Sequence, residues 1–276
     1  MIERLKKQLS LRDEETGEFK YGKFFAFYIV QYALFVALGL SVFSSWENTF
    51  QSPWYSYVAW FVGTHFVLSG FEWGYHRYLL HTVVARWFKS QCEAHTLHHS
   101  HTDVTTIKNQ YEIRHSHQNE AATFPVYALS AFCAVFTPLI WGLQYLLPAA
   151  PVIIGGYSGV MFSLVLYEVY HAVMHLEYDR YWRRWVEKFH LVRQLYGFHL
   201  MHHASIRINQ AIGGFFFLPI WDWVFGTYFV PTSSLPLPGQ ELPQPIPKPP
   251  PARWLTRKLD KITNNAQKRV VLKSRP

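Results

Sequence analysis

Long apolar segments without charged side chains alternate with polar segments along the chain. Residues 24–46 and 121–167 contain no Asp, Glu, Lys or Arg, and residues 54–71 carry only His65 as a titratable group besides tyrosines. A helix of roughly 20 apolar residues spans the hydrocarbon core of a bilayer. The third segment has 47 residues, enough for two such helices, with a proline at each end of a turn at 148–151. The pattern therefore predicts four transmembrane helices in two hairpins.

The overall composition hides this segregation. Half of the 276 residues are hydrophobic, yet the mean hydropathy is −0.03, because the polar and charged residues outside the apolar segments offset them in the average. Gly155, Gly156 and Gly159 lie in the last apolar segment, where small residues permit close contact between helices. The first span has no polar feature of note and is expected to be scaffold.

All 26 Lys and Arg residues fall on one side of the predicted spans, and with the 18 Asp and Glu residues they give the whole chain a formal net charge of +8. Positive charge close to the spans marks the cytoplasmic side. The termini and the histidine-rich segments are therefore expected on the cytoplasmic face of a bacterial inner membrane or of the endoplasmic reticulum. Residues 1–23 are expected to be a cytoplasmic lead-in and not a signal peptide, because Asp13, Glu14 and Glu15 interrupt their basic start.

Ten of the fifteen histidines form four clusters close to the predicted spans. The clusters are His76-x4-His81, His95-x2-His98-His99, His171-x3-His175 and His199-x2-His202-His203. Residues three or four apart share one face of a helix, so each of the last three clusters can direct its imidazoles to one side. His76 and His81 are five apart, about 140° around an α-helix, and are expected to serve different centres.

Ten histidines at ligand spacing predict a pair of metal ions. Imidazole is the commonest metal-binding side chain, a structural zinc needs only four ligands, and ten nitrogens therefore suit two ions with about five ligands each. Thiolate ligands are not expected, because Cys92 and Cys133 lie far apart in the sequence and are predicted to be small buried residues. The expected fold is all-α: an integral membrane protein with four transmembrane helices in two hairpins and a cytoplasmic helical cap that carries the histidine clusters.

Three carboxylates are candidates for supporting these ligands. Glu72 lies one turn before His76 and could orient that imidazole, although an interfacial ion pair with an arginine is an equal alternative. Glu168 lies three residues before His171, in an apolar setting where an acidic group without a partner is costly. Asp222 lies between two tryptophans. It belongs to an aromatic segment, residues 212–230, that is expected either to line a lipid entrance or to form a buried aromatic element.

The remaining polar segments are expected to be peripheral. Residues 179–193 predict an amphipathic helix in the headgroup region, and His190 belongs to that face. Residues 231–251 contain nine prolines, which predicts an extended tether. The last 25 residues have eight basic groups against one acid and predict a basic amphipathic helix for anionic lipid, with a disordered tail as the alternative. Surface positions are expected for His101, His115 and His117.

The four clusters and the segment Trp221-Asp222-Trp-Val-Phe-Gly-Thr227 resemble the fatty acid hydroxylase and sterol desaturase superfamily of integral-membrane diiron enzymes. The resemblance covers residues 54 to about 231. It implies three segments: a lead-in at 1–23, a membrane hydroxylase domain with a dimetal site at 24–231, and a Pro-rich tether with a basic tail at 232–276. The resemblance does not include the fused cytochrome b5 domain found on some members, and none is expected here.

The fatty acyl 2-hydroxylase branch is the nearest resemblance, and it implies how the ligands divide. One metal would take His76, His95, His98, His199 and His202, and the other would take His81, His99, His171, His175 and His203. The spacing of His171 and His175 fits a sterol oxidase less well. The first cluster also looks like that of carotenoid hydroxylases, so the substrate branch stays open.

The resemblance implies a non-haem diiron monooxygenase that hydroxylates a C–H bond of a lipid with O2. Zinc has no accessible redox chemistry, but imidazole binds it more tightly than Fe(II), so purified protein is expected to carry zinc in place of iron in some preparations. No catalytic residue separate from the metal ligands is required. No flavin, haem or iron–sulfur motif is present, so electrons are expected from an external donor such as a ferredoxin or cytochrome b5 with its reductase.

Other partners and functions follow from the same pattern. The lipid substrate and an anionic membrane surface are expected partners, and nucleic acid is not. A diiron desaturase shares the same cofactor and cannot be separated by sequence. A metal transporter or metal-storing protein is an alternative of another class, but transporters place ionisable residues within their spans, and residues 121–167 have none besides Tyr and Cys.

Overall fold

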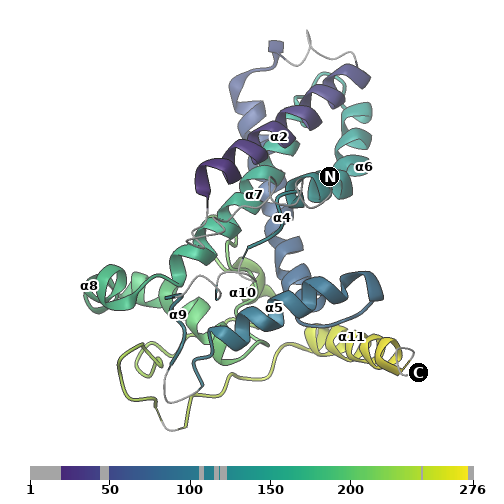
Figure 1. Ribbon diagram of the computed structural model, residues 1–276. Coiled ribbons are helices and arrows are strands. Elements are labelled where there is room, and N and C mark those ends of the chain that lie inside the picture. The colour runs from purple at the N-terminus through teal and green to yellow at the C-terminus, as the bar shows by residue number, and fades with distance from the viewer. Residues whose placement is uncertain are drawn as a thin grey trace, which may run out of the picture. The chain divides into compact units, whose positions relative to one another are not determined.

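Helices make up the regular secondary structure of the computed structural model, which describes residues 20–43, 50–105, 109–114, 118, 123–243 and 245–272. Figure 1 shows them as coiled ribbons. The long helices are α2 (Tyr21–Phe43), α4 (Trp54–Tyr75), α5 (Lys89–His101), α6 (Ala128–Leu146), α7 (Val152–Met174), α9 (His190–Ala204) and α11 (Trp254–Leu272). The short elements are η1 (His76–Leu80), η2 (Arg86–Phe88), η4 (Tyr178–Trp182), α8 (Arg183–Lys188) and α10 (Ile220–Phe225). The all-α prediction is confirmed for these described residues.

The chain divides into two compact units. The first comprises Met1–Leu68 and Phe124–Leu166, and the second comprises Ser69–Thr123 and Tyr167–Pro276. The boundary falls within α4 and α7, so each of these helices contributes residues to both units.

Among the described residues, three helices are long and apolar enough to cross a membrane: α2, α6 and α7. The predicted turn at 148–151 is confirmed, because α6 ends at Leu146 and α7 begins at Val152. α4 has 22 residues, which is long enough, but its Trp, Tyr, Ser, His65 and Glu72 side chains make it more polar than the other three. Length and composition therefore indicate a membrane protein with three candidate spans.

Close helix contact in the first unit depends on two glycines of α7. A Cβ atom on Gly155 would lie 2.4 Å from Cβ of Trp60, and one on Gly159 would lie 2.6 Å from Cβ of Thr64. These separations are far below van der Waals contact, so only glycine fits. The predicted role of these glycines is confirmed. Nearby, Nδ1 of His65 and Oγ of Ser163 lie 2.8 Å apart, which gives this buried imidazole a partner between α4 and α7.

The second unit holds the polar segments that follow α4 and α7 in the chain. The expected amphipathic helix over 179–193 is divided into η4, α8 and the start of α9, with Trp185 and His190 exposed. Within the Pro-rich segment 231–251, the described residues form no helix or strand, as predicted. Leu235 and Leu237 are nevertheless buried, so this segment packs against the unit. α11 is a helix through Leu272, which decides against the disordered alternative for that part of the tail.

Candidate metal centre

The ten predicted ligands come together in the second unit as two groups of five. One group consists of His76, His81, His95, His99 and His202, and the other consists of His98, His171, His175, His199 and His203. Within each group the candidate ligand nitrogens all lie within 4.8 Å of one another. We refer to these groups as centre A and centre B, respectively.

The nitrogen separations match those around a single metal ion. In centre A, Nε2 of His95 lies 2.9 Å from Nε2 of His76, 3.2 Å from that of His81 and 3.2 Å from that of His99. Two nitrogens bound at about 2.1 Å to one ion and at right angles to each other are about 3.0 Å apart. The edges of centre A therefore have the dimensions of a coordination shell.

Centre B has the same dimensions. Nε2 of His199 lies 3.0 Å from Nε2 of His175 and 3.1 Å from Nε2 of His203, and Nε2 of His171 lies 3.0 Å from Nε2 of His98. Eight of the ten histidines are at most 6% exposed, and these include all five residues of centre B, whereas His81 and His99 of centre A are half-buried. Five nitrogen ligands without a thiolate or a carboxylate fit a first-row transition metal.

Hydrogen bonds on the outer ring nitrogens direct lone pairs into both centres. Nδ1 of His76 donates to the carbonyl of Gln210 at 2.6 Å, and Nδ1 of His202 donates to the carbonyl of Ile208 at 2.8 Å. A carbonyl can only accept, so the proton is on Nδ1 and Nε2 carries a lone pair. Both rings belong to centre A, which therefore takes two of its outer partners from the loop that follows α9.

Centre B takes its outer partners from a different part of the chain. Nδ1 of His175 donates to the carbonyl of Tyr111 at 2.7 Å. The Thr102 hydroxyl donates to the carbonyl of His98 at 2.7 Å and accepts from Nδ1 of His203 at 3.0 Å. The lone pairs of His175 and His203 thus both point at Nε2 of His199. Lone pairs crowded in this way repel one another unless a cation lies between them.

Burial keeps these imidazoles neutral. It is the largest cause that lowers the pKa of His95, His98 and His199 well below the ordinary value, and the neighbouring histidines lower it further. Burial lowers the pKa of His202 to about 3. Neutral imidazole is the form that binds a metal, so the site is prepared for a cation at neutral pH.

The expected division of the ligands between the two metals is wrong. His98 and His199, expected with His76, belong to centre B, whereas His81 and His99, expected with His171, belong to centre A. On an α-helix, residues four apart differ by about 40° around the axis and residues three apart by about 60° in the other direction. The pairs four apart, His95/His99 and His199/His203, therefore stay together. The intervening His98 and His202 each reach the opposite centre.

The separation of His76 from His81 is also wrong, and the local helix explains why. Residues His76–Leu80 form a π-helix, and His81 follows directly as its C-terminal cap. Hydrogen bonds in a π-helix join residues five apart, so each turn holds more residues than an α-turn. Two histidines five apart consequently lie on one face, and the ring centroids of His76 and His81 are 5.0 Å apart.

The expected contact between Glu72 and His76 is not found. The Glu72 carboxylate accepts hydrogen bonds from the backbone N–H groups of Gly213 at 2.7 Å and Gly214 at 3.2 Å, and His76 donates to Gln210 instead. The Gln210 carbonyl occupies Nδ1 of His76, so this ring nitrogen is not available to Glu72. Glu72 anchors the loop at 213–214 and not the ligand.

Asp222 supports the site through the backbone. Its carboxylate accepts from the backbone N–H groups of Gln210 at 2.8 Å and Ala211 at 2.9 Å, and from the Thr227 hydroxyl at 2.5 Å. Asp222 therefore holds the peptide whose carbonyl orients His76. Glu168 is buried in α7, and its predicted role beside the metal ligands stays a prediction.

Several site groups carry no signal in the sequence. The carbonyls of Ile208, Gln210 and Tyr111 act through the backbone, which every residue type has. Thr102 is detectable only as a hydroxyl directly after the helix that carries His98. Among the other histidines, His101 joins neither centre, and His115 and His117 lie outside the described residues. Cys92 and Cys133 are free and buried, as predicted.

No protein-family model matches this chain, and comparisons with curated proteins and with solved structures found no match either. The case for a metal centre therefore depends on the geometry of the ten histidines.

Proposed function

We propose that the protein is a membrane-bound, O2-dependent diiron oxygenase that hydroxylates a C–H bond of a lipid, such as a fatty acyl chain. The observation that carries the proposal is the convergence of ten imidazoles, eight of them on buried residues, into two five-nitrogen groups. Two irons, when bound, would supply the redox chemistry that an unactivated C–H bond requires. Zinc in the same ligands would support binding without this chemistry.

The protein's own residues would hold and orient the metals and exclude water. The overall reaction places one oxygen atom of O2 in the C–H bond and reduces the other to water, with two electrons from a donor and two protons. An external donor such as a ferredoxin or cytochrome b5 with its reductase is part of the proposal. The excess of basic residues suits an acidic carrier.

A lipid substrate would enter from the bilayer. Three candidate spans support membrane residence, and we propose that α4 is a fourth, with the termini and both centres on the cytoplasmic side. Phe216, Phe217 and Leu218 follow the loop held by Glu72 and are 39%, 43% and 49% exposed. Such a row of exposed apolar side chains would contact acyl chains more favourably than water.

Desaturation and hydroxylation of a carotenoid or sterol use the same kind of centre and are the alternatives within this class. Conduction of metal ions is less well supported. Buried histidines that are held by hydrogen bonds fix an ion in place. Before Glu168, α6 and α7 carry no Asp, Glu, Lys, Arg or His side chain that could line a path for ions through the membrane.

The proposal can be tested by loading the purified protein with iron and supplying a reductant, O2 and a panel of lipids. Mass spectrometry of the products is the readout. A gain of one oxygen atom, labelled when 18O2 is supplied, supports hydroxylation, whereas a loss of two hydrogens indicates desaturation. If neither product forms from fatty acyl, sterol or carotenoid substrates while both irons are bound and reduced, the oxygenase proposal is contradicted.

A further inference from the structure

The C-terminal helix α11 contacts the first histidine cluster through an ion pair between Arg77 and Asp260. The Arg77 guanidinium donates from Nε to Oδ1 of Asp260 at 2.9 Å and from Nη2 to Oδ2 at 2.7 Å. The side chain of Arg77 is 2% exposed and that of Asp260 is 21% exposed. A two-point contact between a planar guanidinium and a carboxylate fixes both groups in orientation as well as in charge.

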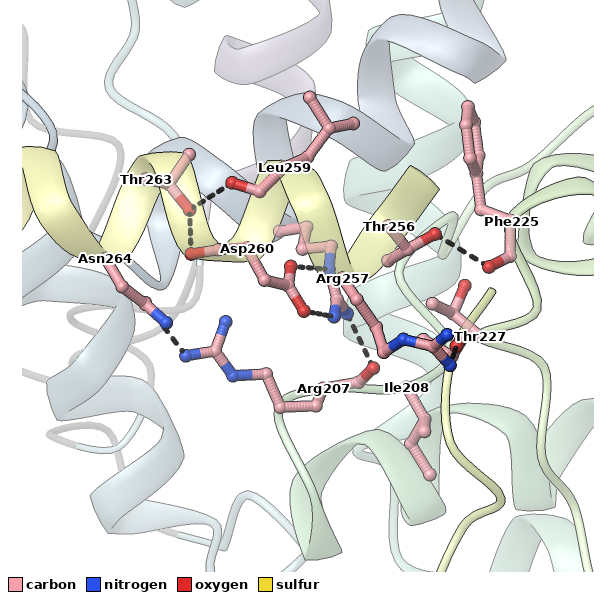
Figure 2. A network of polar contacts seen from close by, with 12 residues as sticks. Arg207, Ile208, Phe225, Thr227, Thr256, Arg257, Leu259, Asp260, Thr263 and Asn264 are labelled. Carbon is pink, nitrogen blue, oxygen red and sulfur yellow. Dashed lines mark hydrogen bonds and ion pairs between the residues drawn. The ribbon is translucent and has the colours of Figure 1, made fainter. Parts of the chain in front are cut away.

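Arg77 also contacts the loop that orients centre A. Its Nη1 donates to the carbonyl of Arg207 at 2.6 Å. The next residue in the chain, Ile208, accepts from His202, and Gln210 accepts from His76. Figure 2 shows Arg207, Ile208 and Asp260 within this network of polar contacts. One buried guanidinium therefore joins α11 to the backbone segment that holds two centre A ligands.

Asp260 is the only acidic residue in α11, and it lies on the side of the helix that faces the rest of the second unit. The Thr256 hydroxyl donates to the carbonyl of Phe225 at 2.8 Å on the same side of α11, whereas Lys258, Lys261 and Ile262 are exposed. The helix thus docks with its polar uncharged face and Asp260 inward. Removal of the Asp260 charge would leave a buried cation on the residue directly after a metal ligand, and that cation would repel a metal ion in centre A.

Two ligands of centre B take their outer partners from elsewhere in the chain. The Tyr111 carbonyl holds His175 and the Thr102 hydroxyl holds His203, and both of these partners lie before α6 and outside the loop at 207–211. A change at Asp260 should therefore affect the two centres unequally.

We infer that Asp260 is a positioning residue for centre A: through Arg77 it fixes the loop at 207–211 and so sets the affinity of centre A, and not centre B, for its metal ion. The inference rests on the dimetal site of the proposed function but not on oxygenase chemistry. Metal binding needs neither O2 nor lipid, so failure of either proposal can be recognised separately.

The test is chelator competition on the full-length protein in detergent, with Zn2+ as the metal and mass-spectrometric metal counting as the readout. Wild-type protein is expected to hold two ions per chain with similar resistance to the chelator. In Asp260→Asn one ion should be bound about tenfold more weakly or worse, as is typical when a ligand's supporting contacts are lost, and the other should be unchanged. Asp260→Glu, which keeps the charge, should restore part of the difference.

Asp179→Asn is the matched control. It breaks an exposed ion pair between Asp179, whose side chain is 63% exposed, and Arg183, whose side chain is 47% exposed. The affinity for both metal ions should remain as in wild type. The weakened ion can be assigned with double variants. Asp260→Asn should weaken the ion that remains in His175→Ala and should leave unchanged the ion that remains in His81→Ala.

Two results would overturn the inference. Unchanged affinity for both ions in Asp260→Asn would show that α11 does not act on centre A. Equal weakening of both ions, accompanied by a lower unfolding temperature, would show that the pair stabilises the unit as a whole and has no selective role.

Discussion

His99 of α5 stacks on His203 of α9, with ring centroids 4.2 Å apart and an angle of 20° between the ring planes. His99 belongs to centre A and His203 to centre B, so the two groups of ligands are in direct ring contact. The two ions would therefore be close neighbours that share no ligand. Chemistry that needs two electrons from two metals requires such proximity.

Removal of one histidine ligand from a centre should abolish the proposed hydroxylation of lipid without preventing membrane insertion. His98→Ala and His203→Ala each delete a nitrogen of centre B and are expected to eliminate product formation. The exposed His190 is one control, and His117, whose surface position is an expectation from the sequence, is the other; their alanine variants should be nearly silent. Product yield and membrane-fraction abundance should be measured together, and full activity in either centre B variant would refute the ligand assignment.

Asp222→Ala should destabilise the second unit. The substitution leaves two backbone N–H groups and the Thr227 hydroxyl without their acceptor, and each unsatisfied buried donor costs about 1–3 kcal/mol. A lower unfolding temperature in detergent and loss of metal from centre A are expected. Glu93→Ala, which removes one partner of an exposed pair with Lys89, should change neither quantity by a measurable amount.

Gly155→Ala should destabilise the first unit. The added methyl group would overlap the side chain of Trp60, and the backbone nitrogen of Phe61 lies 3.1 Å from the same position, so the helices must move apart at a cost of about 1–3 kcal/mol or more. Gly142→Ala in α6 is the control, because no atom lies within 4 Å of its added Cβ. That change should stabilise the helix by up to about 1 kcal/mol. Denaturation in mixed micelles would separate the two outcomes.

Acidification should release the metals and destabilise the metal-free protein. The pKa of His202 is about 3 in the folded protein, and the ordinary value is 6.5. Between these values the unfolded chain binds more protons than the folded one, so stability falls as the pH decreases below about 6.5. Metal content after buffer exchange and the unfolding temperature of the metal-free form, both followed from pH 7.5 to 5, check this expectation. A metal-free form that is equally stable at both values would contradict it.

The sequence singles out all ten histidines that the two centres bring together, eight of them because they recur at three and four residues, as metal ligands on helices do. It could not divide them between the centres. The division depends on the π-turn at His76–Leu80, which brings His81 onto the face of His76, and nothing in the letters of that pentapeptide specifies an extra residue per turn. The hydrogen-bond partners of the outer ring nitrogens are harder still to predict. A backbone carbonyl such as that of Gln210 has no residue-type signature, and the carboxylate of Glu72, one turn before His76, is the more obvious candidate in the sequence.

The π-turn has one further consequence for how the chain is organised. If the additional residue of the π-turn is left out of the count, the first cluster has the same H-x3-H spacing as the third. The second and fourth clusters share the spacing H-x2-H-H. Each long helical pair, α2 with α4 and α6 with α7, is then followed by one doublet and one triplet of histidines, and each triplet lends its middle member to the other half. The site is thus a duplicated half-site with exchanged members, and neither half of the polypeptide contains a complete metal position by itself.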